Sequence, residues 1–176
     1  STDCDNTDCA DAAWIDDIIF PPAYMESEGT PGDVNMDGII NILDVIVIIN
    51  MILGVEGESA LADLNGDGSI NIQDIILVIN LILGPRTDNA SRAQLFDTGS
   101  EMKIEANGYI GGVQMTLKHG ADFSIKITDQ AMDVSAYRTV GNETILVIVA
   151  PDSDELFTYS GDFEIVDMIV ANSEGR

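Results

Sequence analysis

A 30-residue internal repeat constrains the fold of this chain more than any other feature of its sequence. Residues 33–54 and 63–84 align without a gap and match at most positions of their apolar halves. Chance does not produce such a match, so the segment is a duplicated supersecondary unit. Each copy is predicted to be a polar loop followed by a helix, over residues 42–53 and 72–83, and each helix is closed by a glycine.

The loop of each repeat places oxygen-bearing residues at the spacing of a calcium-binding loop. Side-chain oxygens stand at loop positions 1, 3, 5, 9 and 12, and a glycine stands at position 6, where such a loop turns sharply. Calcium takes roughly six to eight oxygen ligands, and the backbone carbonyl at position 7 supplies one more. One such string also occurs in ordinary polar turns, but two in register, each leading into a helix, favour binding. We predict two calcium ions, held by Asp33, Asn35, Asp37, the Ile39 carbonyl, Asn41 and Asp44, and by Asp63, Asn65, Asp67, the Ser69 carbonyl, Asn71 and Asp74.

Two details of these loops resemble the dockerin family rather than ordinary EF-hands. Position 12 is Asp instead of Glu, and Pro31-Gly32 leaves no room for a helix entering the first loop. The resemblance covers residues 31–84. It implies a domain that needs calcium to fold and that plugs into a cohesin module, which is a β-sandwich.

The two predicted helices are unusually apolar for a surface that binds and releases a partner. Residues 42–53 contain only Asp44 and Asn50 as polar residues, and residues 72–83 contain only three. A helix that is apolar on nearly all sides must be buried on nearly all sides. We therefore expect a permanent cover, either from the chain's own second half or from a neighbouring chain.

The second half of the chain changes to the two-residue period of β-strands. Residues 102–106 alternate apolar and charged, while residues 143–150 and 163–171 are nearly unbroken apolar runs that predict strands covered on both faces. Six or seven antiparallel strands are expected, and residues 109–117 resemble an early strand of cohesin-like sandwiches. The predicted class is α+β, with an N-terminal extended segment (1–30), a dockerin-like domain (31–84) and a small β-sandwich (85–176).

The N-terminal segment contains one short apolar run, residues 14–20, stopped by two prolines. We expect a strand that covers an exposed sheet edge, either in its own chain or in a neighbouring subunit. Cys4 and Cys9 are predicted to form a local disulfide; a bond between chains or two unpaired thiols are the alternatives.

Charge excludes several classes of partner. The chain carries 31 Asp and Glu against seven Lys and Arg, a formal charge of −24. Such a chain repels phosphate backbones and anionic lipid, so we expect neither nucleic-acid binding nor membrane insertion, and no apolar run reaches the roughly 18 residues of a membrane helix. The start at Ser1 without Met suggests a processed mature end, so we expect an extracellular or cell-surface protein.

No catalytic constellation stands out, so we expect a protein that is not an enzyme. The single histidine, His119, lies in a predicted turn and is expected at the surface. The first functional hypothesis is a structural subunit that binds other copies of itself in a surface layer or fibril, stapled by calcium. The alternative is a dockerin-type anchoring module that binds a separate cohesin in a carbohydrate-active or adhesive assembly.

Overall fold

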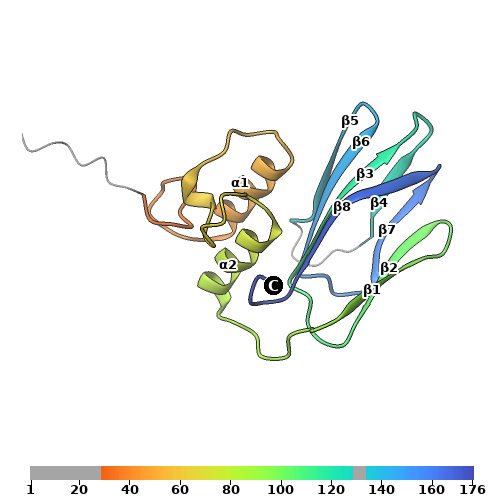
Figure 1. Ribbon diagram of the computed structural model, residues 1–176. Coiled ribbons are helices and arrows are strands. Elements are labelled where there is room, and N and C mark those ends of the chain that lie inside the picture. Colours follow the sequence, from red (N-terminus) through yellow and green to blue (C-terminus); the bar gives the residue numbers. More distant parts are fainter. Residues whose placement is uncertain (1–28, 129–133) are drawn as a thin grey trace, which may run out of the picture.

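The duplicated segment folds into two helices that lie beside a β-sandwich (Figure 1). The computed structural model describes residues 29–128 and 134–176. The predicted strand at 14–20 and the cysteines Cys4 and Cys9 lie outside the described residues. The helical elements are α1 (Ile42–Ile52), the short 3-10 helix η1 (Ala60–Ala62) and α2 (Ile72–Leu83).

Both α-helices begin at the residue that the repeat predicts, because each loop ends in a capping box. The side chain of Asn71 accepts a hydrogen bond from the Gln73 N–H, and the Asp74 carboxylate accepts one from the Asn71 N–H. Asn41 and Asp44 repeat this arrangement at α1. These bonds satisfy N–H groups that a helix start otherwise leaves without a partner. No helix enters the first loop within described residues 29–32.

The second half forms two antiparallel sheets of four strands, which confirms the predicted α+β class with a sandwich. The order is β1-β2-β7-β4 in one sheet and β5-β6-β3-β8 in the other. All pairings between the described strands of these sheets are antiparallel. The strands are β1 (Ala93–Asp97), β2 (Glu101–Ala106), β3 (Gly112–His119), β4 (Ser124–Ile127), β5 (Ala136–Val140), β6 (Glu143–Val149), β7 (Glu155–Ser160) and β8 (Phe163–Ala171).

The central strands of the sheet β5-β6-β3-β8 are covered on both faces, as the side chains of β6 show. Leu146 and Ile148 point between the two sheets, into a core that includes Phe157. Val147 and Val149 point the other way and share a second core with α1 and α2. Strand residues alternate between the two faces of a sheet, so the unbroken apolar run of β6 serves both cores, as predicted.

The helix α2 is the element that joins the helical segment to the sandwich. Its residues Ile72, Ile75 and Ile76 are 0–2% exposed. A Cβ atom on Gly112 of β3 would lie 2.5 Å from Cδ1 of Ile72, so only glycine allows the helix to approach this closely. The Ile72 N–H also donates to Oε1 of Gln114, at 3.0 Å.

The C-terminal tail closes the same junction. The side chain of Gln73 donates to the Gly175 carbonyl, and the side chain of Asn80 donates to the Ser173 carbonyl. Ser173 is 2% exposed and donates in turn to the Arg86 carbonyl, at 3.1 Å. The expected permanent cover is therefore the chain's own second half.

Three expectations from the sequence are wrong in part. The helix α1 is not buried on all sides, because α2 occupies the sheet face and α1 packs chiefly on α2. His119 is 8% exposed, because β3 runs one residue into the predicted turn, where His119 pairs with Phe163 and its Nε2 lies 2.8 Å from Thr144 Oγ1. Among the described strands β8 pairs only with β3, and Met168 is 43% exposed although the apolar run predicted cover on both faces.

The junction predicts losses of stability of unequal size at equivalent positions of the repeat. Ile72→Ala removes a fully buried side chain and should lower the free energy of unfolding by about 2–4 kcal/mol. Ile42→Ala, thirty residues earlier and 37% exposed, should cost less than about 1 kcal/mol. Urea unfolding in saturating calcium measures both values. Equal losses at the two positions would contradict the described junction.

Candidate functional site

The first predicted calcium loop is folded around its own carboxylates. Oδ1 of Asp33 accepts a hydrogen bond from the Asp37 N–H, and Oδ2 accepts one from the Gly38 N–H, at 3.1 and 3.0 Å. Oδ1 of Asp37 accepts from the Ile39 N–H at 2.8 Å. Gly38 has φ +86°, the left-handed conformation that the sharp turn at position 6 requires. The side chains at positions 1 and 5 therefore both turn into the loop.

The second loop repeats this geometry. Oδ2 of Asp63 accepts from the Gly68 N–H at 2.9 Å, and Oδ1 of Asp67 accepts from the Ser69 N–H at 2.8 Å. Gly68 has φ +83°. The match extends beyond sequence to the backbone conformation of the glycine at position 6 and to most of the hydrogen bonds, although Oδ1 of Asp63 accepts from the Gly66 N–H where Oδ1 of Asp33 accepts from the Asp37 N–H.

The aspartates at position 12, Asp44 and Asp74, are the most deeply buried acids of the two loops, each 0% exposed. Oδ1 of Asp44 accepts from the N–H groups of Val34 and Asn35, at 2.8 and 3.1 Å, and Oδ2 accepts from the Asn41 N–H. Asp74 makes the corresponding three bonds in the second loop. Each carboxylate thus ties the start of its loop to the start of its helix.

Burial raises the pKa of Asp74 above its ordinary value. Hydrogen bonds from the N–H groups of Asn71, Asn65 and Leu64 lower the pKa, and the negative charge of Asp63 raises it again. A cation in the loop would favour the ionised form of these carboxylates and offset the cost of burying them.

The donor chemistry of both loops fits calcium. Every predicted ligand is an oxygen donor, as a hard cation prefers, and the loops contain neither sulfur nor imidazole. Within the described residues, no three His, Cys, Asp or Glu side chains are gathered into a metal-holding group. Amide and carbonyl oxygens belong to the predicted set as well, so the assignment of Asp33, Asp37, Asp44 and their repeat partners as ligands stays a prediction.

The outer face of α1 is the second notable surface of the helical segment. Ile42, Leu43 and Ile46 are 37%, 52% and 40% exposed, and Ile39 in the preceding loop is 64% exposed. Ile42, Leu43 and Ile46 lie on one side of α1, and Ile39 precedes the helix in the loop. An apolar helix face of this kind is typical of a surface that binds a protein partner. The sequence predicted these apolar positions but not which of the two helices would expose them.

Comparison with known proteins assigns the helical segment to a class. Paired loop–helix units with aspartate at position 12 define a duplicated calcium-loop domain, and residues 31–83 match the family model of the dockerin type I domain. The predicted dockerin resemblance is therefore confirmed for this segment, which is under a third of the chain. No curated protein and no solved structure matches the chain.

The family match bears on the two functional hypotheses. It favours the anchoring alternative, and it lends no support to self-assembly into a surface layer or fibril. Among the described residues, no helix has both the length and the apolarity needed to cross a membrane. The predicted domain boundaries and the predicted absence of enzymatic activity stay predictions.

Calcium removal tests the loops directly. Excess EGTA should lower the melting temperature by about 10 °C or more and reduce helical circular dichroism, because each bound ion at 100 times its Kd stabilises the folded state by about 2.7 kcal/mol. The double variant Asp33→Ala, Asp63→Ala in calcium should melt like the wild type in EGTA, and titration calorimetry on the wild type should count two ions per chain.

A matched control is Asp152→Ala with Asp154→Ala, which removes two exposed acids of the sandwich. This control should respond to calcium like the wild type. A loop variant that kept the full calcium response would refute the ligand assignment.

Proposed function

We propose that this protein is an extracellular, calcium-stabilised anchoring module, whose dockerin-type segment docks a separate cohesin through the exposed face of α1. In this role the chain binds a protein partner and catalyses no reaction. Calcium, as two ions in the two loops, holds the docking helix in place by fixing its first turn.

Residues at equivalent positions of the two repeats differ in exposure, and this difference is the main support for the proposal. Ile42 of α1 is 37% exposed while Ile72 of α2 is 0% exposed, and Ile46 is 40% exposed while Ile76 is 2% exposed. Both copies have isoleucine at these two positions, and among the described residues only the α2 pair is covered. The α1 face is the more apolar of the two, because Ile39 and Leu43 stand where the second copy has Ser69 and Gln73. Ile42 and Ile46 therefore correspond to side chains that, in α2, pack in a core shared with a β-sheet.

The surface on which α2 packs indicates what kind of partner would bind α1. The α2 face lies on the sheet β5-β6-β3-β8, against small and apolar residues such as Gly112, Val149 and Ala171. A β-sheet surface of similar character would suit the equivalent α1 face. Cohesin modules, which the family resemblance implies as partners, are β-sandwiches and offer such a surface.

The packing of α2 on this sheet face disfavours self-assembly through α1. The sheet face that suits these helices is occupied by the chain's own α2, so a second copy could offer that face only by releasing its buried core. A separate cohesin therefore fits the α1 face better than another copy does.

Charge supports a protein partner over other classes. All seven Lys and Arg residues follow Pro85, so the dockerin-type segment carries acidic residues only. A partner surface that is apolar with a basic rim would complement it. Nucleic acid and anionic membrane would be repelled.

The experiment is titration calorimetry of the chain against a panel of type I cohesin modules in calcium. Leu43→Asp places a charge at the centre of the α1 face and should weaken binding at least a hundredfold, since a desolvated unpaired charge at an interface core costs about 3 kcal/mol or more. Leu83→Asp, at a 66% exposed position of α2, is the matched control and should leave affinity within threefold.

Unfolding curves establish that both variants stay folded. Equal binding by Leu43→Asp and the wild type would refute the α1 face as the docking site. Failure of every cohesin in the panel to bind the wild type would refute the proposed function.

A further inference from the structure

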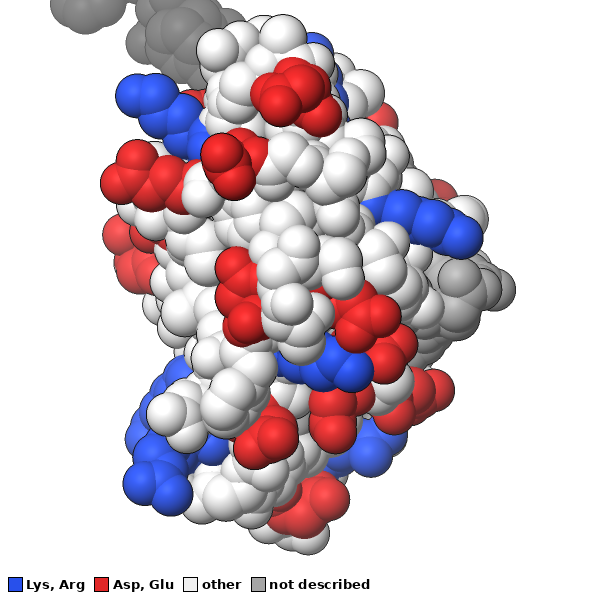
Figure 2. All heavy atoms as spheres, turned by 90° about the vertical axis from the view of Figure 1, so that its right-hand side faces the viewer, with Lys and Arg blue, Asp and Glu red and all other residues white. Residues whose placement is uncertain are grey.

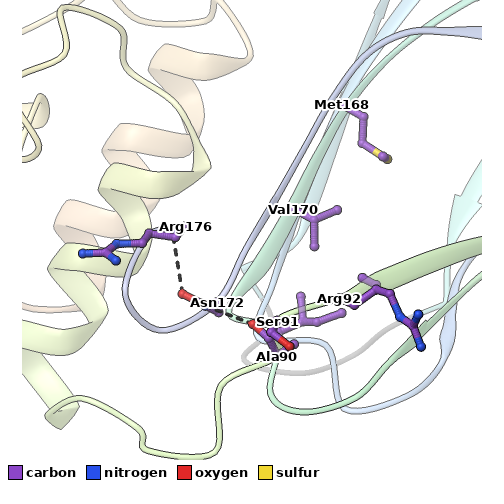
Figure 3. Close-up of a pocket in the computed structure, with 9 residues that line it drawn as sticks. Ala90, Ser91, Arg92, Met168, Val170, Asn172 and Arg176 are labelled. Atoms are coloured by element: carbon purple, nitrogen blue, oxygen red, sulfur yellow. Dashed lines mark hydrogen bonds between the residues drawn. The ribbon is translucent and has the colours of Figure 1, made fainter.

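The open side of the sandwich holds an apolar groove that the helical segment does not cover. A cavity of about 390 Å³ lies where β1 and β8 flank the interior of the sandwich. Figure 3 shows Met168 and Val170 projecting from β8 on the side of the segment that carries Arg92. At one end, Nδ2 of Asn172 donates to the Ala90 carbonyl at 3.1 Å and closes the groove.

Both strands that flank the groove are edge strands. β1 pairs only with β2, and β8 pairs only with β3, within the described sheets. An edge strand exposes a row of N–H and C=O groups that can pair with a further strand. The groove is therefore bordered by two unused hydrogen-bonding edges.

Two side chains of β8 that point between the sheets are only partly covered. A β-bulge opposite Thr116 shifts the alternation of β8, so that Ile169 and Ala171 pack toward the helices. Met168 and Val170 consequently point into the space between the sheets, yet Met168 is 43% exposed and Val170 is half-buried. Residues that point into a sandwich core are normally covered, so this space is shaped for additional apolar side chains.

The chain contains one segment whose chemistry matches this groove. Residues 14–20 read Trp-Ile-Asp-Asp-Ile-Ile-Phe, which in an extended conformation places Trp14, Ile18 and Phe20 on one face with only one acid between them. Residues 1–28 contain eight acidic residues and no basic one. A surface that binds such a segment would be apolar and would have positively charged residues at its border.

The groove has that border. Arg92 and Arg176 are two of the seven basic residues of the chain, and both line it. Arg92 forms no ion pair within the described residues, whereas Arg176 lies 3.9 Å from Glu174. Figure 2 shows basic and acidic side chains interspersed over the sandwich face that it presents. With only seven basic residues in the chain, two arginines at one groove give it a locally positive border.

The place where the described chain begins favours a second copy as the source of the segment. Gly29 lies against Leu61, and Figure 1 shows this start on the side of the helices away from the sandwich. Eight residues, two of them proline, separate residue 20 from Gly29 and span at most about 30 Å. A return within the same chain would have to pass around two helices, each about 10–12 Å across, before reaching the groove.

We infer that the groove between β1 and β8 binds residues 14–20 of a second copy of this chain, which add as a strand to the β8 edge and fill the space beside Met168 and Val170. The interaction is head-to-tail, because the donated segment and the groove are different surfaces of the same chain. It uses neither the α1 face nor the calcium loops.

A complementation experiment on the full chain in saturating calcium tests this inference. Ile18→Asp removes the donor function and keeps the groove, whereas Met168→Asp blocks the groove and keeps the donor. Size-exclusion chromatography with light scattering should show that wild-type mass rises with concentration while each variant alone is monomeric. An equimolar mixture of the two variants should give a dimer and nothing larger, because each chain supplies what the other lacks.

Controls separate this contact from misfolding and from cohesin docking. Val140→Asp, at a 61% exposed position of β5 on the opposite edge, should associate like the wild type, and so should Leu43→Asp. Thermal unfolding should give melting temperatures for Ile18→Asp and Met168→Asp close to that of monomeric wild type. Arg92→Glu should weaken association about threefold to tenfold, with a larger effect at low salt.

Three outcomes would overturn the inference. They are a wild type that is monomeric at all concentrations, single variants that retain the wild-type mass, and a variant mixture that stays monomeric. A monomeric wild type that Ile18→Asp destabilises would assign residues 14–20 to their own chain. None of these outcomes affects cohesin binding through α1, so the two proposals fail independently.

Discussion

The packing of α2 against the sheet β5-β6-β3-β8 is the contact on which the rest of the structure depends. Without the helix, the sheet would expose Val147 and Val149, and without the sheet, the helix would expose Ile72 and Ile76. The sandwich has a core of its own between its two sheets, and it shares a second core with the helices. The two polar loops act on this contact indirectly, because Asp74 caps the first turn of the helix that makes it.

This contact also breaks the symmetry of the repeat. The two units share isoleucine at the positions of Ile42 and Ile72 and of Ile46 and Ile76, but the sandwich has only one sheet face available to them. Ile72 and Ile76 pack on that face, and Ile42 and Ile46 stay exposed among the described residues. One copy is therefore part of the core, and the other is the copy that we propose binds a partner. The division is stable because exchanging the two would require the buried core to open.

The sandwich also has an incompletely covered side, at the edge strand β8. The helices protect one face of β8, whereas its outer edge pairs with no other described strand, Met168 is 43% exposed and Val170 is only half-buried. The distribution of charge follows the same division, since all basic residues lie in the second half and Arg92 lies at the groove. The apolar surfaces at α1 and at β8 are therefore separate. We propose a cohesin as the partner of the first and residues 14–20 of a second copy as the partner of the other.

The sequence by itself determined the local structure. Repetition, loop spacing and capping residues such as Asn71 and Asp74 fixed the two loops and the starts of both helices, because those features depend on neighbours within about ten residues. Period-two alternation fixed the class of the second half. Only the tertiary structure decided which repeat is buried, that His119 lies inside, and that β8 is an edge strand. These outcomes depend on contacts between residues far apart in the chain, and an isoleucine at both Ile42 and Ile72 does not by itself determine which one the sheet will cover.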